Sequence, residues 1–398
     1  MTSSRTRMIE RVRVLFAIPE LGSGGPDRVF FELLCGLDRN AFQPVLLVTK
    51  AGGRYFESLP RDVETCVIGG GRYPAWRFAR AVDRLRPDVV LTTLRMNTTA
   101  SAARIFQRHR PPLICRQANA IGSNFKELRR RSRLKYGFAE WAMKKLLRIP
   151  DALVAQSSDM GVELARDASP AQKIAVIGNP VSTDDVMRAC VEQSARVART
   201  RFGNPALVAV GRLTPQKGFD LLLEAFAQVQ REYKDAGLTI LGDGPDRAQL
   251  EADAERLGIA EKLRLPGHSD CVLAEVAAAD IFVSSSRYEG FSNAILEAMA
   301  LGTPVVATAC EGGTRDMVVD GQTGILAGAV SADALVEALQ HALRMDLGSL
   351  GQAGREHVGS TFSRGTILEE YAALFREVLG QGDDLTDPSH QSRKQIQP

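Results

Sequence analysis

The chain has 398 residues, 44% of them hydrophobic and 24% charged, and its net charge at pH 7 is +3. That composition is ordinary for a globular protein, and the length allows two domains with a core each. No segment of the sequence reaches the roughly 20 consecutive apolar residues of a membrane-spanning helix.

The small net charge hides a strong asymmetry along the chain. Residues 1–182 hold 30 Lys and Arg against 16 Asp and Glu, a net charge of +14, whereas residues 183–398 have a net charge of −11. A basic half joined to an acidic half suggests that the first half faces an anionic partner. A membrane surface, a phospholipid-like substrate and nucleic acid all fit this description.

The six cysteines are scattered and include no C-x-x-C pair. Several lie in apolar runs, which favours buried free thiols and a reducing cytoplasm. The first apolar run, residues 12–18, is short for a signal peptide and no small-residue cleavage site follows it. We therefore expect a first buried strand there.

Short β-branched apolar runs alternate with helical patterns along the chain, which is the βαβ rhythm of parallel sheets covered on both faces. The rhythm occurs twice, with a break at residues 177–185, and predicts an α/β protein of two facing doubly wound, Rossmann-like domains. Ligands of such sheets bind at the carboxyl ends of the strands, so an interdomain cleft is the expected site. The expected strands are residues 12–18, 44–49, 65–68, 88–93, 112–116, 152–157, 206–211, 238–242, 263–267, 281–285 and 304–308.

The break gives the domain boundaries. We place the N-terminal domain at residues 1–182 and the C-terminal domain at 183–365. Residues 366–380 are expected to form a helix that packs back towards the N-terminal domain. The polar tail, residues 381–398, is expected to be disordered.

A glycine-rich loop, Gly22-Ser23-Gly24-Gly25, follows the first expected strand and precedes a helical pattern. Glycines at such a place let the backbone approach a phosphate or a sugar. The spacing is not G-x-G-x-x-G and no acidic ribose ligand follows, which disfavours an NAD site.

The segment 126–148 is strongly basic, with nine Lys and Arg against two Glu, and it includes Tyr136, Phe138 and Trp141. One interpretation is a solvated basic helix with its aromatic residues packed inward. The other is a surface that contacts anionic lipid. Nucleic acid is the least favoured partner.

Arg212 and Lys217 flank the junction between an expected strand and the helix that follows it. A single Arg or Lys is more often a solvated surface residue. Two cations at a strand's carboxyl end, beside a helix N-terminus, can instead hold a diphosphate and stabilise it as it leaves. The position of both residues favours the phosphate interpretation.

The most informative stretch is R-Y-E-G-F-S-N-A-I-L-E-A-M-A-L-G-T-P, residues 287–304. Glu289 stands in a turn after an apolar strand pattern, and Glu297 lies in a helix that Ser292 can cap and Gly302 can end. A strand, a tight turn and a helix N-terminus present backbone N–H groups to an anion, with a carboxylate on each side. A nucleotide sugar, with phosphate between two hydroxyl-bearing ends, suits this arrangement.

Other glycine turns carry weaker signals. Residues 241–245, 265–268 and 320–324 are expected to be structural turns. Gly312-Gly313-Thr314 is placed to add N–H donors near a donor sugar. The sequence has no H-E-x-x-H, G-K-[ST] or G-x-S-x-G motif and no D-x-D pair at a strand end, which disfavours a metal site and a serine nucleophile.

Taken together, these motifs resemble the retaining glycosyltransferases of family 4, the group 1 class with the GT-B fold. The resemblance is strongest from residue 206 to 326, where V-G-R-L-T-P-Q-K-G, L-G-D-G-P, E-G-F-S-N-A-I-L-E-A-M-A-L-G-T-P and D-G-Q-T-G occur in order. It is weaker at G-S-G-G-P-D-R-V and I-G-N-P-V. At the level of the fold it covers nearly the whole chain.

The resemblance implies roles for individual residues. Arg212 and Lys217 would bind the donor diphosphate, Glu297 the ribose hydroxyls and Glu289 the transferred sugar. The implied catalytic residues are Arg212, Lys217 and Glu289. The implied donor-binding residues are Gly24, Gly25, Arg212, Lys217, Glu289, Gly290, Phe291, Ser292 and Glu297.

The chain departs from the family pattern on the acceptor side. Many members have a histidine after the strand that ends here at Cys115-Arg116, and this chain has none there, so a catalytic histidine cannot be carried over. Acceptor contacts are expected instead at Arg116 and Asn119. The family's G-G-A-E-R is Gly25-Pro26-Asp27-Arg28 here.

The implied activity is transfer of a sugar, with UDP-sugars favoured as donors, to a lipid-linked or glycan acceptor in lipopolysaccharide or polysaccharide synthesis. No cofactor, metal or nucleic acid is expected, and the expected location is the inner face of the cell membrane, with 126–148 contacting anionic lipid. Two alternatives stay open: a nucleotide-sugar 2-epimerase of the same fold, and a non-catalytic nucleotide-sugar-binding protein. Product analysis separates the first from a transferase, and donor turnover excludes the second.

Overall fold

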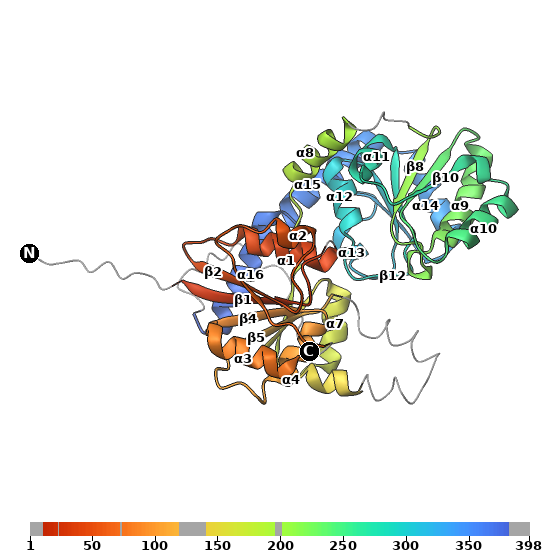
Figure 1. The fold of residues 1–398 in the computed structure, drawn as a ribbon. Coiled ribbons are helices and arrows are strands. Elements are labelled where there is room, and N and C mark those ends of the chain that lie inside the picture. The colour runs from red at the N-terminus through yellow and green to blue at the C-terminus, as the bar shows by residue number, and fades with distance from the viewer. Residues whose placement is uncertain (1–10, 23, 72–73, 119–140, 196–200, 382–398) are drawn as a thin grey trace, which may run out of the picture. The chain divides into compact units, whose positions relative to one another are not determined.

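The structure is a computed structural model that describes residues 11–22, 24–71, 74–118, 141–195 and 201–381 (Figure 1). The chain forms two compact units. Unit 1 comprises residues 1–156, 160–178 and 367–398, and unit 2 comprises residues 157–159 and 179–366.

Seven strands form one parallel sheet in unit 1, in the order β3-β2-β1-β4-β5-β6-β7. Five of them lie within two residues of the bounds that the sequence predicts, and β1 coincides with its prediction. The seventh strand, β7, was not predicted; it is a short strand at the edge of the sheet. The bounds are β1 Val12–Ile18, β2 Phe42–Val48, β3 Glu64–Val67, β4 Val89–Thr93, β5 Leu113–Arg116, β6 Ala152–Ala155 and β7 Lys173–Val176.

Helices cover both faces of this sheet because β1 is apolar on both sides. Leu15 points into a core shared with Phe78 of α3 and Ala100 of α4. The neighbouring Phe16 packs its ring at 5.7 Å from Phe30 of α1, on the other face. The helices of unit 1 are α1 Gly25–Gly36, α2 Arg54–Glu57, α3 Ala75–Leu85 and α4 Arg95–Ala103, with most of α7 Ser158–Asp167 and of α16 Arg364–Val378.

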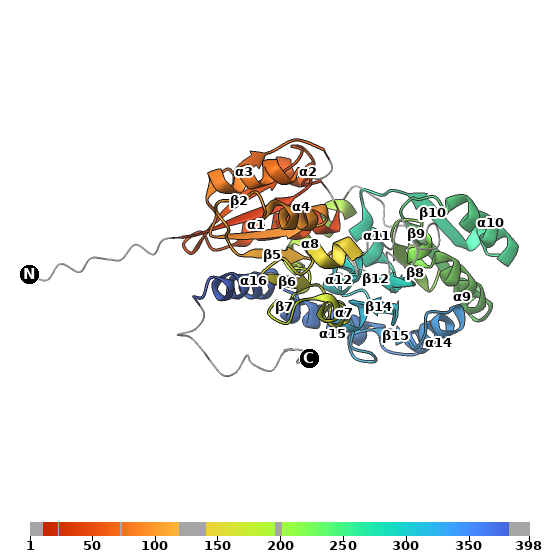
Figure 2. The same cartoon turned by 90° about the horizontal axis from the view of Figure 1, so that it is seen from below.

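The last helix, α16, lies along the sheet of unit 1 (Figure 2). The ring of Phe375 meets the rings of Phe16 and Phe42 edge-on, at centroid distances of 6.2 and 6.0 Å. Phe375 and its neighbour Tyr371 are both fully buried. Burying a side chain of that size stabilises the fold by roughly 1.5–3 kcal/mol, which fixes the helix on this unit.

Six strands form the parallel sheet of unit 2, in the order β10-β9-β8-β11-β13-β15. Five match predicted strands, and the three-residue β15 was not predicted. Two very short strands, β12 and β14, pair apart from the main sheet. The bounds are β8 Ala206–Val210, β9 Gly237–Leu241, β10 Leu263–Gly267, β11 Ile281–Ser284, β12 Tyr288–Glu289, β13 Val305–Thr308, β14 Glu311–Gly312 and β15 Ile325–Ala327.

The helices of unit 2 also lie on both faces of their sheet. Phe226 of α9, Leu250 of α10 and Leu339 of α14 share one core with the β8–β9 strands. The helices α11 and α12 pack on strands β8, β11 and β13. The bounds are α8 Thr183–Ser194, η1 Pro215–Lys217, α9 Phe219–Glu232, α10 Arg247–Leu257, η2 Ala260–Lys262, α11 Val272–Ala278, α12 Asn293–Leu301, α13 Thr314–Met317, α14 Ala332–Leu343 and α15 Leu347–Thr361.

Both sheets reverse their strand order at one point. In unit 1 the switch falls between β1 and β4, and in unit 2 between β8 and β11. The connections that follow the two strands at such a point run to opposite sides across the sheet, so the loops separate and leave a crevice for a ligand. The predicted α/β class with two doubly wound sheets is therefore confirmed, and the switch in unit 2 marks where its site should be sought.

Candidate active site

The loops that follow β8 and β11 bring the predicted donor-binding residues of unit 2 together. These strands are neighbours in the sheet, and both present their carboxyl ends at the same edge. Arg212 and Lys217 follow β8, and Glu289 follows β11. Three residues that are as much as 77 positions apart in the sequence therefore share the switch point of the sheet.

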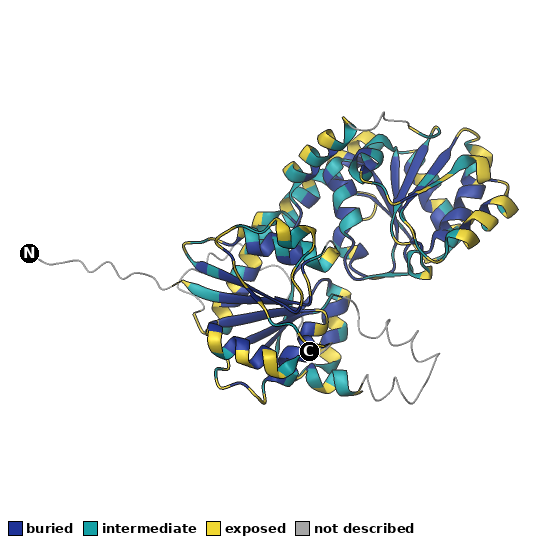
Figure 3. Ribbon diagram, in the orientation of Figure 1, coloured by how far each residue is buried: buried dark blue, intermediate teal, exposed yellow. Residues whose placement is uncertain are grey.

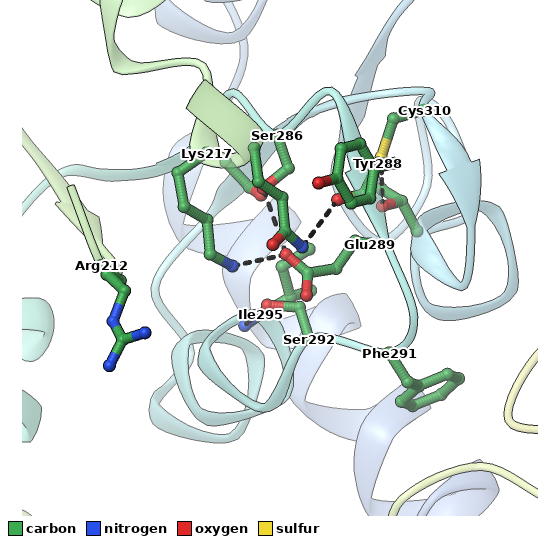
Figure 4. A network of polar contacts seen from close by, with 12 residues as sticks. Arg212, Lys217, Ser286, Tyr288, Glu289, Phe291, Ser292, Ile295 and Cys310 are labelled. Atoms are coloured by element: carbon green, nitrogen blue, oxygen red, sulfur yellow. Dashed lines mark hydrogen bonds and ion pairs between the residues drawn. The ribbon is translucent and has the colours of Figure 1, made fainter. Parts of the chain in front are cut away.

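An ion pair joins Lys217 to Glu289, with Nζ against Oε2 (Figure 4). The two side chains are only 20% and 12% exposed. The Oγ of Ser286 donates a second hydrogen bond, of 3.1 Å, to the same carboxylate oxygen. Partial exclusion of water strengthens both contacts relative to a surface pair and fixes the direction of the carboxylate.

Backbone contacts lock the short helix η1 against the segment that carries Glu289. Gly218 has φ of +62°, and a Cβ there would overlap the carbonyl oxygen of Ser285. The Oγ of Ser285 donates 2.8 Å to the carbonyl of Lys217, and Nε2 of Gln216 donates 3.1 Å to the carbonyl of Tyr288. Lys217 is thus held in place by the hydrogen bond that its carbonyl accepts from Ser285 and by the ion pair of its ammonium with Glu289.

A second ion pair, between Arg287 and Asp220, joins the segment that precedes Glu289 to the start of α9. Arg287 donates to both carboxylate oxygens of Asp220, at 2.7 and 2.6 Å, and also to the carbonyl of Pro215 at 2.9 Å. The hydrogen bonds from Arg287 lower the pKa of Asp220, and the same bonds raise the pKa of Arg287. Bidentate pairs of this kind are among the stronger charge-assisted contacts.

Gly312 and Gly313 lie so close to the backbone of Glu289 and to Phe291 that a side chain at either position would collide with them. Gly312 pairs with Glu289 between β14 and β12 and has φ of +117°, and a Cβ there would overlap the backbone oxygen of Glu289. The N–H of Gly313 donates 3.3 Å to that same oxygen. A Cβ on Gly313 would lie 2.5 Å from the ring of Phe291. In this structure the glycine pair shapes the backbone around Glu289, and its predicted role as a set of donors to the sugar stays a prediction.

Helix α12 begins beside Glu289, as the sequence predicts. Ser292 is its N-cap and accepts a long hydrogen bond, 3.5 Å, from the N–H of Ile295, and Gly302 ends it with φ of +77°. Phe291, just before the cap, is buried, and its ring lies 5.3 Å from that of Phe362. Glu297 lies within α12 and is half-buried.

Arg212 stands apart from this hydrogen-bonded network, and no contact joins it to the other labelled side chains of Figure 4. Its side chain is exposed. The turn that carries it is backed by Gly244, where a Cβ would overlap the carbonyl of Leu213, and the N–H of Leu213 donates 3.0 Å to the carbonyl of Asp243. The predicted structural turn at residues 241–245 therefore supports the loop of Arg212.

The predicted donor-binding residues of unit 1, Gly24 and Gly25, lie at the start of helix α1. The N–H of Gly24 donates 2.9 Å to Oδ2 of Asp27 at the start of α1, and burial raises the pKa of Asp27. Gly25 is the first residue of that helix. Asp27 therefore supplies a carboxylate that accepts from the backbone of its own loop.

Arg116 was expected to contact an acceptor, but its side chain is fully buried at the end of β5. It lies close enough to Tyr371 of α16 for its charge to act on the phenol, whose pKa is raised by burial. Its carbonyl accepts from Asn97 at 3.0 Å and from Thr93 at 3.2 Å. Contact with an acceptor would require this part of unit 1 to open. Asn119, the other expected acceptor residue, lies outside the described residues.

Sequence reasoning missed several members of the site. Ser286, Gln216 and the Arg287–Asp220 pair were not singled out, although they contact Lys217 and Glu289 or the segments that carry them. The run of three serines before Arg287 was a usable signal, because hydroxyls at the end of a buried strand need partners. The pairing of Glu289 with Gly312 had no such signal, because it joins separate loops.

Two features are absent from the part of the chain that the structure describes. In that part, no group of three or more His, Cys, Asp and Glu side chains could hold a metal ion. Nor does any helix there have the length and apolar character needed to cross a membrane.

The architecture is that of the GT-B glycosyltransferases. Anabaena Alr3699/HepE in complex with UDP superposes with a TM-score of 0.74 at 17% sequence identity, over 92% of this chain and all of that one. The apo form of the lipopolysaccharide outer core galactosyltransferase WaaB gives a TM-score of 0.69 at 18% identity, over 92% and 99% of the two chains.

The chain belongs to the group 1 glycosyltransferases. The family "Glycosyl transferases group 1" matches residues 192–357, and "Glycosyl transferase 4-like domain" matches residues 24–180. The lipopolysaccharide core biosynthesis glycosyltransferase LpsE of Rhizobium meliloti is 28% identical over 88% of this chain and 95% of its own length. A GDP-mannose-dependent phosphatidylinositol monomannoside mannosyltransferase of Mycolicibacterium smegmatis is 32% identical over 45% of this chain and 51% of its own.

Proposed function

We propose that this chain is a retaining glycosyltransferase that moves a sugar from a nucleotide sugar to a hydroxyl of a lipid-linked or glycan acceptor in cell-surface glycan synthesis. The observation that carries the proposal is the partly buried pair of Lys217 and Glu289 at the switch point of unit 2, with the exposed Arg212 five residues before Lys217 in the same loop. A diphosphate and a sugar need a cation and a carboxylate next to each other, and this edge of the sheet supplies both.

Donor binding would redistribute the charges of the pair. The diphosphate of a nucleotide sugar carries negative charge and would attract Lys217 and Arg212, which frees the Glu289 carboxylate to accept from a hydroxyl of the sugar. Ser286 would keep Glu289 in place as its ion-pair partner turns to the phosphate. Glu297, one helix turn into α12, is proposed to hold the ribose hydroxyls, and the Gly24-Gly25 loop is proposed to contact the donor.

The proposed reaction breaks the bond between the anomeric carbon and the diphosphate oxygen and forms a bond from that carbon to the acceptor oxygen on the same face. The acceptor proton passes to the leaving phosphate oxygen, and a nucleoside diphosphate departs. Charge builds up on the diphosphate in this transition state, so Arg212 and Lys217 would bind it more strongly than the ground state. Because these cations can stabilise the leaving group, we propose that no metal or other cofactor is required.

UDP-sugars are the favoured donors, since the similar structure of HepE was determined with UDP and with UDP-glucose. GDP-sugars are the second choice, because the mycobacterial relative is GDP-mannose-dependent. A glycan of the lipopolysaccharide type is the favoured acceptor, in line with the relative LpsE. None of the six cysteines is in a disulfide, as expected for an enzyme of the cytoplasmic face of the membrane.

The basic segment 126–148 is proposed to contact anionic lipid at that face. Most of it lies outside the described residues, and the proposal rests on its nine basic residues and its aromatic residues. Trp141, in the described part, is exposed.

The test is a screen of UDP-, GDP- and ADP-sugars by thermal shift, followed by product analysis. A donor present at 100 times its Kd should stabilise the protein by about 2.7 kcal/mol. Slow hydrolysis of that donor to free sugar of unchanged anomeric configuration, and transfer once an acceptor is added, are expected. Release of a 2-epimerised sugar would instead identify an epimerase, and stabilisation without any turnover would identify a binding protein.

A further inference from the structure

One surface of unit 1 outside the predicted donor and acceptor positions is both basic and apolar. It consists of the outer side of α3 and the turn that follows α4, residues 75–86 and 104–110, and is called the α3 face below. These two stretches contain seven arginines and a single acidic residue, Asp83. In Figure 3 the outer side of α3 includes exposed residues, and its inner side packs on the sheet.

The two sides of α3 differ completely in chemistry. Phe78, Val82 and Leu85 point inward and are buried in the core of unit 1. Trp76 and Arg80, four residues apart, share the outer side, and the guanidinium of Arg80 lies 5.4 Å from the centre of the Trp76 ring. A tryptophan that is 55% exposed keeps most of its apolar surface in contact with water, which is costly unless a partner covers it.

The turn after α4 is fastened beside the end of α3. Oδ1 of Asp83 accepts from the backbone N–H groups of Arg108 and His109, at 3.0 and 2.8 Å. Just before this anchor, Ile105 and Phe106 are 76% and 55% exposed. Ile105 is the most exposed of the large hydrophobic residues in the described part of the chain, so the turn holds two apolar side chains out from the surface.

The positive charge of the α3 face is largely uncompensated. Within the described residues, Arg104 is the one arginine of the seven that pairs with a carboxylate, that of Asp151 at 2.7 Å. Arg77 donates to the carbonyl of Ile68 and Arg84 to the sulfur of Cys66, both of which are neutral acceptors. The one acidic side chain, Asp83, is occupied by backbone N–H groups.

We propose that the α3 face docks on an anionic lipid bilayer, with its arginines on the lipid phosphates and Trp76, Ile105 and Phe106 in the interfacial layer. Charge complementarity favours this partner, because seven cations against one anion fit a surface of regular negative charge. Ile105, next to Phe106 in the turn, favours lipid over nucleic acid. An aliphatic side chain can enter the interfacial layer of a bilayer, whereas nucleic-acid bases stack on flat aromatic rings. The inference is independent of the sugar chemistry and adds a second, separate surface to the membrane contact proposed for 126–148.

The first experiment measures binding to vesicles with and without phosphatidylglycerol, at low and high salt. The α3-face variant carries Arg80→Ser, Arg84→Ser and Arg108→Ser. Each arginine near an anionic surface strengthens binding roughly fivefold, so this variant should bind on the order of 100-fold more weakly. A matched control removes three exposed arginines of unit 2 and should bind like the parent: Arg231→Ser, Arg256→Ser and Arg344→Ser.

A second experiment uses the two tryptophans of the chain as reporters of the two surfaces. In the Trp141→Phe variant the emission comes from Trp76, and in the Trp76→Phe variant it comes from Trp141. Anionic vesicles should shift the emission of Trp76 to shorter wavelength, because the ring enters a less polar layer. Vesicle binding that persists at high salt is expected to come from the apolar residues. Changing Trp76, Ile105 and Phe106 together to Ser should therefore remove it.

Several results would overturn the proposal. The α3-face variant could bind as tightly as the parent while changing Arg129, Arg130, Arg131 and Arg133 to Ser abolishes binding, which would leave 126–148 as the sole contact. Trp76 emission could stay unchanged on vesicles that the protein binds. The α3-face changes could also leave vesicle binding intact and instead abolish self-association or binding to single-stranded RNA. Either result would assign the surface to another partner. Donor hydrolysis without vesicles tests the proposed function separately and should be equal in all these variants.

Discussion

The buried hydroxyl of Ser286 donates a 3.1 Å hydrogen bond to Oε2 of Glu289, the oxygen that also meets the ammonium of Lys217. Ser286 is itself fixed, because its carbonyl accepts a 2.5 Å hydrogen bond from the Thr308 hydroxyl on the next strand of the sheet. The direction of the Glu289 carboxylate is therefore set from the sheet and does not depend on Lys217 alone. This leaves Lys217 able to exchange its partner for a phosphate.

Ser286→Ala tests this arrangement. Loss of a hydrogen bond to a charged group is worth about 1.5–3 kcal/mol, so we expect kcat for donor hydrolysis to fall roughly 10- to 100-fold, with a smaller effect on donor KM. Ser286→Thr, which keeps a hydroxyl, should recover part of the loss. Ser360→Ala removes an exposed hydroxyl bond and serves as the control. Equal kcat values for Ser286→Ala and the parent would mean that Ser286 does not position Glu289.

Lys217→Ala tests the leaving-group role. A cation that binds the diphosphate more tightly in the transition state should contribute on the order of 100-fold or more to the rate. The expected result is a loss of that size in kcat/KM for transfer, with Lys234→Ala, an exposed lysine of the same unit, unchanged. Near-normal turnover in Lys217→Ala would remove the residue from the mechanism.

Gly312 and Gly321 form a matched pair for testing the backbone around Glu289. Both have positive φ, +117° and +71°, but a Cβ on Gly312 would overlap the oxygen of Glu289, whereas a Cβ on Gly321 meets nothing within 4 Å. Gly321→Ala should cost about 1–2 kcal/mol of stability from backbone strain alone and leave kcat unchanged. Gly312→Ala should cost more and abolish turnover, since it displaces Glu289. Urea unfolding and donor hydrolysis measure the two effects, and an active Gly312→Ala enzyme would contradict this account of the site.

Metal independence is tested with a chelator. The proposed mechanism assigns stabilisation of the diphosphate to Arg212 and Lys217. Donor hydrolysis and transfer should therefore be as fast in excess EDTA as without the chelator. Loss of activity in EDTA that added Mg²⁺ or Mn²⁺ restores would show that a cation shares this role.

The parts of the fold that local sequence determines were predictable, and those that depend on distant contacts were not. The bounds of β1 and the two caps of α12 follow from an apolar run, a serine and a glycine close together in the sequence. The edge strand β7 is only half-buried and β15 is only three residues long, so neither has a long apolar run that the sequence could reveal. Arg116 shows the same limit at the level of function. An arginine at a strand end is usually exposed, but Arg116 is fully buried near Tyr371, which lies in a helix far along the chain.

Cysteine reactivity gives a prediction that depends on the core of unit 1. Full burial raises the pKa of Cys115 to about 12, from an ordinary value of 9.0, because the thiolate would lose its hydration. At pH 8 the folded protein should therefore react with a thiol reagent at the half-buried Cys35, while Cys115 reacts only on unfolding. The folded state keeps a proton that the unfolded chain releases above about pH 9, so this group stabilises the fold fully below that pH and its contribution is lost as the pH rises towards 12. Mass spectrometry of alkylated peptides, with and without urea, measures the order of reaction. Rapid labelling of Cys115 without urea, at a rate equal to that of Cys35, would mean that the carboxyl end of β5 is open to water.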